Sequence, residues 1–206
     1  MSFEIRGSRR MRGLRTEVTY FSEPGKQNTR STVELAIRRA VARRIKHIVV
    51  ASGTGKTGVL VAEKAAKRGI NTVVVTYHSG FEKKGEGTLT RENLERLQEL
   101  NVRIVSATHA FSGIERAITK KFGGPSRVEV IAEALRSLFG QGMKVCVEIG
   151  AMAADSGCIP VDDKTEIIAI AGTDEGADTA IVMRPSNASS FFELEIREII
   201  AMPRKR

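Results

Sequence analysis

Residues 46–66 read KHIVVASGTGKTGVLVAEKAA and combine three kinds of local sequence. The apolar run at 47–52 does not alternate with polar residues, which is typical of a strand buried on both faces of a parallel sheet. The glycine-containing segment Ser52–Thr57 follows, and the alanine-rich residues from about 58 to 68 favour a helix that stops at Gly69. A strand, a tight loop and a helix in this order predict one unit of an α/β fold.

The same alternation continues along the chain. Apolar runs at 71–78 and 102–109 predict two more strands, separated by a charged, glycine-rich loop at 79–90 and a helix at 91–100. This βαβαβ series indicates a parallel sheet with right-handed crossovers. We also expect helices that begin at residue 31 or 32 and that cover 111–122, 126–139 and 143–157, and strands at 165–173, 177–186 and 191–204. The strand at 177–186 follows a short connection and is expected to run antiparallel to its neighbour.

These elements predict one domain over residues 19–206, preceded by a basic arm at 1–18. Residues 1–15 hold five arginines and one glutamate, and the last three residues are basic, so only +2 of the net charge of +9 belongs to residues 16–203. No aromatic–basic motif accompanies this charge, and we expect no specific nucleic-acid partner.

No apolar run reaches the roughly 18 residues of a membrane span, so we expect no membrane association. Cys146 and Cys158 lack metal-type spacing and are interpreted as small buried apolar residues of a cytoplasmic protein.

The Walker A pattern G-x-x-x-x-G-K-[ST] matches this chain only in part. Gly55-Lys56-Thr57 fits its end, but its first glycine falls on Val50, inside the predicted strand. No acidic residue closes an apolar strand in the way that magnesium binding requires, and Asp174 is the nearest candidate. We therefore expect no hydrolysis of ATP or GTP.

Anion binding does not need the full motif. Gly53 and Gly55 allow backbone N–H groups to converge on an oxyanion, and the N-terminus of the following helix faces the same place. The side-chain donors of this loop are Ser52, Thr54, Lys56 and Thr57. A tight turn with nothing bound is the alternative, but four donor side chains exceed what a turn needs. The loop thus predicts a phosphate site.

Seven sequence segments, one of which contains the loop, carry a resemblance to a known family. They are HIVVASGTGKTG (47–58), VVVTYHSGF (73–81), THAFSGIERAI (108–118), KFGG (121–124), AMAADSGCIP (151–160), IAGTDEGADTAIV (170–182) and REIIAMPR (197–204). With them the chain resembles the C-terminal α/β domain of pyruvate kinase, and more closely the stand-alone archaeal and bacterial relatives of that domain.

The resemblance implies a three-layer α/β/α sandwich with strand order 3-2-1-4-5, counted from the strand at 47–52, and with the fifth strand antiparallel. In pyruvate kinase the matching loop holds a phosphate of the allosteric sugar bisphosphate. The barrel that carries the catalytic site of pyruvate kinase has no counterpart here, so that activity is excluded. The resemblance to the stand-alone relatives implies flavin mononucleotide (FMN) as the cofactor, and the family resemblance implies a homo-oligomer.

In such a sheet, ligands bind at the carboxyl ends of the strands where the strand order reverses, here between the first and fourth strands. The loop at 52–57 would take the phosphate, and Gly172, Thr173 and Asp178 of the opposite loop would meet a ribityl chain or sugar hydroxyls. The ends of the second and third strands would supply residues that flank a flat ring or another part of the ligand: His78, Phe81, Thr108, His109 and Phe111.

His78 and His109 are the candidates for a catalytic acid–base role, with helix capping or packing as the alternative for each. His47, at the start of a strand, is assigned to packing, and no metal site is expected because a third ligand is missing. Glu148 and Asp155 share one face of a predicted helix, where each is either a buried partner of a lysine or histidine or part of the site.

Three functions follow from these residues and from the resemblance. The first is the binding of a phosphorylated ligand, with FMN preferred. The second is a regulatory module that senses a sugar phosphate and acts through a partner. The third is an enzyme on a phosphorylated metabolite; no nucleophile–base pair is visible in the sequence, so whether the chain is an enzyme stays open.

Overall fold

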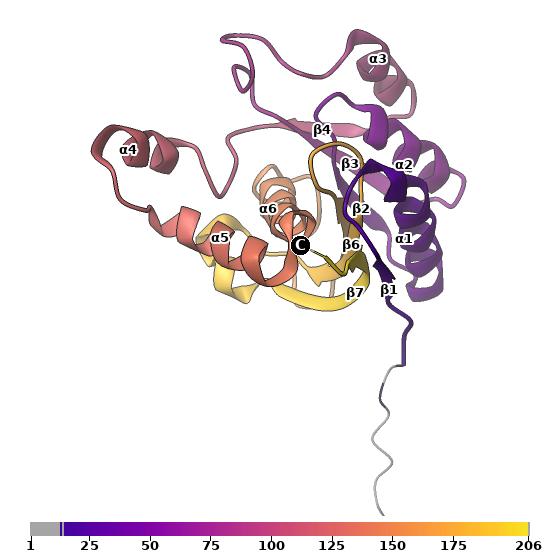
Figure 1. Ribbon diagram of the computed structural model, residues 1–206. Helices are drawn as coiled ribbons and strands as arrows, with labels where there is room; N and C mark the ends of the chain where they lie inside the picture. The colour runs from indigo at the N-terminus through magenta and orange to yellow at the C-terminus, as the bar shows by residue number, and fades with distance from the viewer. Residues whose placement is uncertain (1–12, 14, 206) are drawn as a thin grey trace, which may run out of the picture.

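The computed structural model describes residue 13 and residues 15–205, and Figure 1 shows a central sheet between helices. The strands are β1 (Thr19–Phe21), β2 (His47–Ala51), β3 (Asn71–Thr76), β4 (Arg103–Ser106), β5 (Ile167–Ala171), β6 (Thr179–Arg184) and β7 (Glu195–Pro203). The helices are α1 (Thr29–Arg43), α2 (Lys56–Ala66), α3 (Arg91–Glu99), α4 (Ile114–Phe122), α5 (Arg127–Phe139) and α6 (Gln141–Asp155), with 3-10 segments η1 (Lys26–Asn28) and η2 (Ala188–Glu193).

The strands form one mixed sheet in the order β1-β7-β6-β5-β2-β3-β4. β2 pairs in parallel with β3 and β5, and β4 continues in parallel beyond β3. β6 runs antiparallel to β5, so the predicted order 3-2-1-4-5 with an antiparallel fifth strand is confirmed. Two further strands extend the sheet beyond β6: β7, and next to it the short β1. Of these two, only β1 was not predicted from the sequence.

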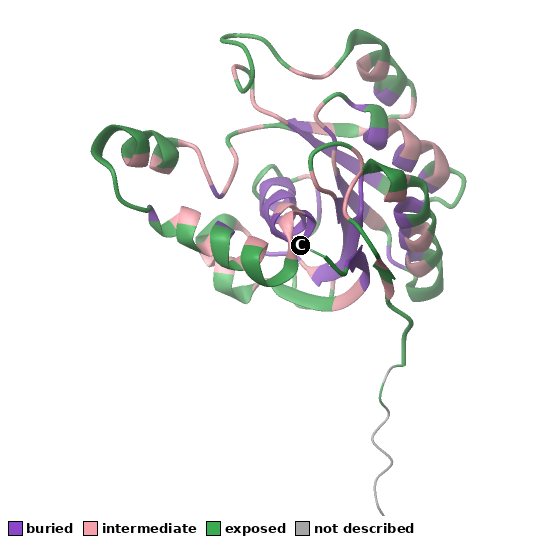
Figure 2. Cartoon of the chain, viewed as in Figure 1, coloured by how far each residue is buried: buried purple, intermediate pink, exposed green. Residues whose placement is uncertain are grey.

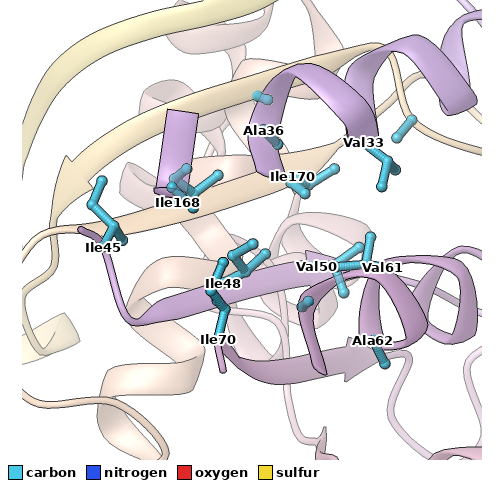
Figure 3. Packing of buried hydrophobic residues seen from close by; sticks show 14 of the residues in the cluster. Val33, Ala36, Ile45, Ile48, Val50, Val61, Ala62, Ile70, Ile168 and Ile170 are labelled. Carbon is cyan, nitrogen blue, oxygen red and sulfur yellow. The ribbon is translucent and has the colours of Figure 1, made fainter. Parts of the chain in front are cut away.

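The two faces of β2 explain why its apolar run does not alternate. Ile48 and Val50 pack on one face with buried residues of α1 and α2, among them Val33 and Val61 (Figure 3). Val49 belongs to the second core cluster, on the α6 side of the sheet. Because helices cover both faces, the predicted three-layer α/β/α sandwich is confirmed.

Two helices lie outside these layers. α5 packs on α6 through a small apolar cluster that includes Phe111, Ala132 and Val147. α4 packs on α5 and contains no buried residue. Figure 2 shows both helices, mostly exposed, extending away from the sheet. The α4–α5 pair therefore forms an arm beside the core.

Helix α1 and strand β7 have boundaries that differ from the prediction. α1 begins at Thr29, directly after η1, and the side chain of its N-cap residue Asn28 makes no capping hydrogen bond. β7 begins at Glu195, because η2 occupies residues 188–193, part of which was predicted as strand. A short 3-10 segment thus leads directly into α1 and shifts its start towards the N-terminus, whereas η2 takes the first residues of the strand expected at 191–204.

Helix α6 also begins earlier than predicted, at Gln141, and runs through Gly142. The predicted helices at 126–139 and 143–157 leave Gly142 between them, but it lies inside α6 and marks a close approach between α6 and β6. A Cβ atom on Gly142 would lie 2.1 Å from Thr179 Oγ1. The absence of a side chain at this position therefore lets the helix pack directly on the strand.

The predicted basic arm at 1–18 lies mostly outside the described residues, and the first described strand begins at Thr19. Cys146 is buried, whereas Cys158 is only partly buried, and both are free thiols. Within residues 15–205, no helix combines the length and apolar character that crossing a membrane requires.

Candidate functional site

The loop between β2 and α2 turns tightly because two glycines occupy positions that other residues cannot. Gly55 has a φ of 92°, in the left-handed region, and a Cβ atom on it would lie 2.5 Å from Leu89 Cδ1. Gly53 lies against the ring of Tyr77, whose Cε2 would be 2.7 Å from an added Cβ. The loop backbone is therefore held close to β3 and to the segment before α3.

Hydrogen bonds from neighbouring segments fix the carbonyl groups of this loop. The Gly53 carbonyl accepts from Thr76 Oγ1 at 2.9 Å and from Thr88 Oγ1 at 2.8 Å. The Thr54 carbonyl accepts from Asn93 Nδ2 at 2.9 Å. Because these carbonyl oxygens are hydrogen-bonded to residues of β3, of α3 and of the segment between them, the N–H groups of the loop can face away from those elements.

The N–H groups of residues 53–57 have no acceptor among the described residues. They include the first N–H groups of α2, which carry the positive end of the helix dipole. Ser52 Oγ accepts from the Gly58 N–H at 3.1 Å and so braces the first turn of the helix. Lys56 is exposed and forms no ion pair with a described residue. This arrangement can bind an oxyanion such as a phosphate group.

A cavity of about 690 Å³ opens beside this loop at the carboxyl ends of β2, β3 and β5. α6 forms its opposite wall with Val145, Ile149 and Met152. The predicted site residues that line the cavity are Ser52, Gly53, Thr54, Lys56, Thr57, Phe81, His109 and Gly172. The structure thus brings the predicted phosphate loop and parts of three other predicted segments to one cavity.

Other predicted site residues lie outside the lining of this cavity: Gly55, His78, Thr108, Phe111, Thr173 and Asp178. Phe111 is instead buried in the apolar cluster between α5 and α6. Asp178 is fully buried, and its Oδ2 accepts from the backbone N–H groups of Gly25 at 2.9 Å and Thr173 at 3.1 Å. Its Oδ1 accepts from Thr179 Oγ1 at 2.8 Å. Asp178 therefore fixes the loop after β5 to the segment before α1 and is fully occupied by that role.

Aromatic side chains gather at the ends of β3 and β4. The rings of Tyr77 and Phe81 are stacked, with centroids 4.0 Å apart and an interplanar angle of 3°. The ring centroid of His109 lies 5.2 Å from that of Phe81 and 5.6 Å from that of His78. Tyr77 was not predicted as a site residue, although it stands between two predicted segments in VVVTYHSGF. Of these rings, Tyr77, Phe81 and His109 line the cavity and form an aromatic wall on one side of it.

Burial sets the protonation of two members of this wall. It lowers the pKa of His109, against the opposing effect of the Glu148 carboxylate, which raises that pKa. The imidazole is therefore neutral at neutral pH. Burial also raises the pKa of Tyr77, so its hydroxyl stays protonated. Both can act as hydrogen-bond donors and acceptors towards a ligand.

A buried ion pair lies in the wall that α6 contributes. Lys144 Nζ donates to Glu148 Oε2 at 2.6 Å, and Glu148 Oε1 accepts from the Phe111 N–H at 3.0 Å. Glu148 is therefore a partner of a lysine and also part of the cavity lining. Lys144 was not predicted, although its position four residues before Glu148 on an apolar helix was a usable signal. Asp155 instead accepts hydrogen bonds from residues 187 and 188, at 3.0 Å each, and lies away from the cavity.

Charged groups of both signs surround the mouth of the cavity. Lys26 and Glu175 form an exposed ion pair at 2.9 Å, and the Lys26 hydrogen bond lowers the pKa of Glu175. Glu82 and Asp174 add carboxylates, and Arg116 adds a positive charge. Among the described residues, no group of three or more histidine, cysteine or acidic side chains could hold a metal ion. The site can thus bind a phosphate at the loop and hydroxyl groups at the carboxylates.

Among solved structures, the chain shows a distant similarity to a methyltransferase of Podospora anserina, PaMTH1, solved with bound SAH, at 12% identity and a TM-score of 0.30, over 68% of this chain and 52% of that one. It therefore spans about half the length of that protein. The family model described as "Pyruvate kinase, alpha/beta domain" matches residues 30–183, about three quarters of the chain, including the loop at 52–57. The chain therefore belongs to the pyruvate kinase alpha/beta domain family.

Proposed function

We propose that this protein binds a phosphorylated small molecule, with FMN as the preferred ligand. The observation that carries the proposal is the set of N–H groups at residues 53–57, which have no acceptor among the described residues and stand at the N-terminus of α2. Lys56 and the hydroxyl groups of Thr54 and Thr57 border the same cavity. A phosphate dianion would satisfy these donors together.

The rest of the cavity supports a ligand with a flat ring and a hydroxylated chain. Its volume of about 690 Å³ lies within the range of sites for cofactors and drug-sized molecules. Phe81 is 40% exposed, so one face of its ring is open to stacking, and neutral His109 stands beside it. Asp174 and Glu175 can accept hydrogen bonds from a ribityl chain. A bound flavin would supply redox chemistry.

The test is a visible absorption spectrum of the freshly purified full chain, before and after addition of FMN and desalting. We expect the protein to retain the flavin absorption. Lys56→Ala should weaken FMN binding about tenfold or more, since a hydrogen bond to a charged group contributes about 1.5–3 kcal/mol. Lys67→Ala, an exposed substitution just past the other end of α2, is the matched control and should bind like the unchanged chain. Riboflavin, which lacks the phosphate, should bind weakly to all of them.

A second candidate, a sensor of sugar phosphates, is supported by the carboxylates Glu82, Asp174 and Glu175 at the cavity mouth, which suit a polyhydroxylated ligand. Thermal unfolding separates the two. A ligand that binds only the folded state raises Tm, and the rise grows with the logarithm of 1 + [ligand]/Kd. A rise with a sugar bisphosphate but not with FMN, abolished by Lys56→Ala, would replace the flavin proposal. A protein that takes up no FMN and whose Tm responds to neither ligand would contradict both.

A further inference from the structure

One carbonyl group of the loop at 52–57 accepts hydrogen bonds from two hydroxyl groups of the segment that follows β2 and α2 in the chain. The Gly53 carbonyl accepts from Thr76 Oγ1 at 2.9 Å and from Thr88 Oγ1 at 2.8 Å. Thr76 is the last residue of β3, whereas Thr88 lies in the loop before α3. The two bonds occupy both lone pairs of the oxygen. They therefore fix the orientation of the peptide group that joins Gly53 to Thr54.

The orientation of this peptide group decides where its donor points. A peptide group is planar and trans, so its C=O and N–H point to opposite sides. With the Gly53 carbonyl turned to the two hydroxyl groups, the Thr54 N–H points the other way, and it has no acceptor among the described residues. The next peptide group repeats the arrangement, since Asn93 Nδ2 donates to the Thr54 carbonyl at 2.9 Å and so turns the Gly55 N–H away from α3. Side chains outside the loop thus aim two of its N–H donors.

Thr88 belongs to the same loop as the aromatic ring proposed to stack on the ligand. This loop joins β3 to α3 (Figure 1), and none of its residues from 79 to 87 is buried. Phe81 is held at its near end by the stacked ring of Tyr77, 4.0 Å away between centroids. At its far end, the Thr88 hydroxyl group ties the loop to the Gly53 carbonyl. One hydrogen bond therefore connects the loop that carries the ring to the peptide group that carries a phosphate donor.

We propose that Thr88 is a positioning residue of the phosphate site and that it couples the phosphate half of the ligand to the ring half. This inference rests on the proposed function. A phosphate that accepts from the Thr54 N–H favours the peptide orientation in which the Gly53 carbonyl faces Thr88. The same hydrogen bond holds the loop that places Phe81 beside the ligand ring. Each half of the ligand therefore binds more tightly when the other half is bound.

The first test compares Thr88→Val with Thr88→Ser in the full chain. Valine keeps the shape of threonine without the hydroxyl group, and the Gly53 carbonyl keeps its bond from Thr76, so the variant should fold, as circular dichroism and Tm would confirm. We expect Thr88→Val to weaken binding of FMN, followed by flavin fluorescence, and of inorganic phosphate, followed by Tm, by about three- to tenfold each.

The conservative variant and a neighbouring position serve as controls. Thr88→Ser restores the hydroxyl group and should bind both probes like the unchanged chain. Ser79→Ala removes a hydroxyl group from an exposed position of the same loop and should also leave both affinities unchanged. If Thr88→Val binds inorganic phosphate as tightly as the unchanged chain, the positioning role of Thr88 is wrong.

The second test supplies the two halves of FMN separately, as riboflavin and inorganic phosphate. Replacing chloride by phosphate at constant ionic strength should raise the riboflavin affinity of the unchanged chain and of Thr88→Ser by about fivefold, and that of Thr88→Val not at all. A riboflavin affinity that phosphate leaves unchanged in the unchanged chain, or a rise that persists in Thr88→Val, would refute the coupling. An unchanged chain that binds neither FMN nor inorganic phosphate contradicts the proposed function as well, whereas equal binding of both by Thr88→Val contradicts only the role of Thr88.

Discussion

The substitution Lys144→Met isolates the energetics of the buried ion pair in the cavity wall. Lys144 is 8% exposed and Glu148 is 4% exposed, and the two side chains are joined at 2.6 Å. Methionine preserves an unbranched apolar side chain beside the ring of Phe111, over which the Lys144 ammonium lies at 5.6 Å. The change therefore removes the positive charge and leaves the carboxylate of Glu148 without its counter-charge.

Removal of one partner of a buried ion pair costs about 3–5 kcal/mol, because the remaining charge stays desolvated. Lys144 and Glu148 line a cavity of about 690 Å³, which water can enter, so the lower end of that range applies. We expect the free energy of unfolding of Lys144→Met to fall by about 3 kcal/mol. For a chain of this size, that loss corresponds to a decrease in Tm of roughly 6–12 °C.

The assay is urea and thermal unfolding of the unchanged chain, Lys144→Met and the double variant Lys144→Met/Glu148→Leu. Removal of both charges should restore most of the stability, since an apolar pair of similar size replaces a buried ion pair at little cost. A deficit of about 1 kcal/mol should remain, because the Phe111 N–H loses its acceptor. The reasoning fails if Lys144→Met costs less than about 1 kcal/mol, or if the double variant is no more stable than the single one.

Three further perturbations have expected outcomes. Gly142→Ala should lower the free energy of unfolding by about 1–3 kcal/mol in a urea titration, because an added Cβ would overlap β6, from which it would be 2.1 Å away. Burial lowers the pKa of both His47 and His109 below 6.5, so just below that pH the unfolded chain binds more protons than the folded one. Tm should therefore fall as the pH drops below 6.5, and His109→Gln should make Tm depend less steeply on pH. Burial raises the pKa of the Cys146 thiol well above its usual range, so a thiol reagent under native conditions should label Cys158 and leave Cys146 unmodified until urea is added, as peptide mass spectrometry would show.

The fold was largely predictable because its central strands carry a strong local signal. β2 and β5 are apolar along nearly their whole length, and β3 carries three consecutive valines, a pattern typical of strands whose two faces are both covered. β1 lacked such a signal, since three residues become a strand only by pairing with the end of β7, far away in sequence. Gly142 misled the prediction for a related reason: a glycine that permits helix–strand contact looks the same in sequence as one that ends a helix.

In the candidate site, too, the residues that could be predicted are those with a local sequence signal, and the residues that were missed depend on tertiary packing. The loop at 52–57 was predictable because its donors are consecutive in the chain. Tyr77 and Lys144 were missed because their positions depend on packing across the sheet and on the face that α6 turns to the cavity. The role of Asp178 also depends on tertiary structure: a carboxylate next to a predicted ligand loop can face a ligand or hold backbone N–H groups, and only the contacts of Gly25 and Thr173 distinguish these.

The position of Val50 explains why the partial match to an NTPase loop favours a different ligand. A Walker A loop starts with a glycine at that position and wraps several phosphates, but Val50 is fully buried in β2, so the turn before α2 is only residues 52–55. The carbonyls of this short turn are bound by β3 and by the segment that leads into α3. The N–H groups that remain, at 53–57, lie in one short stretch at the N-terminus of α2. Under the proposed function these few donors would meet a single phosphoryl group, which is why we propose a phosphate monoester such as FMN rather than a nucleoside triphosphate.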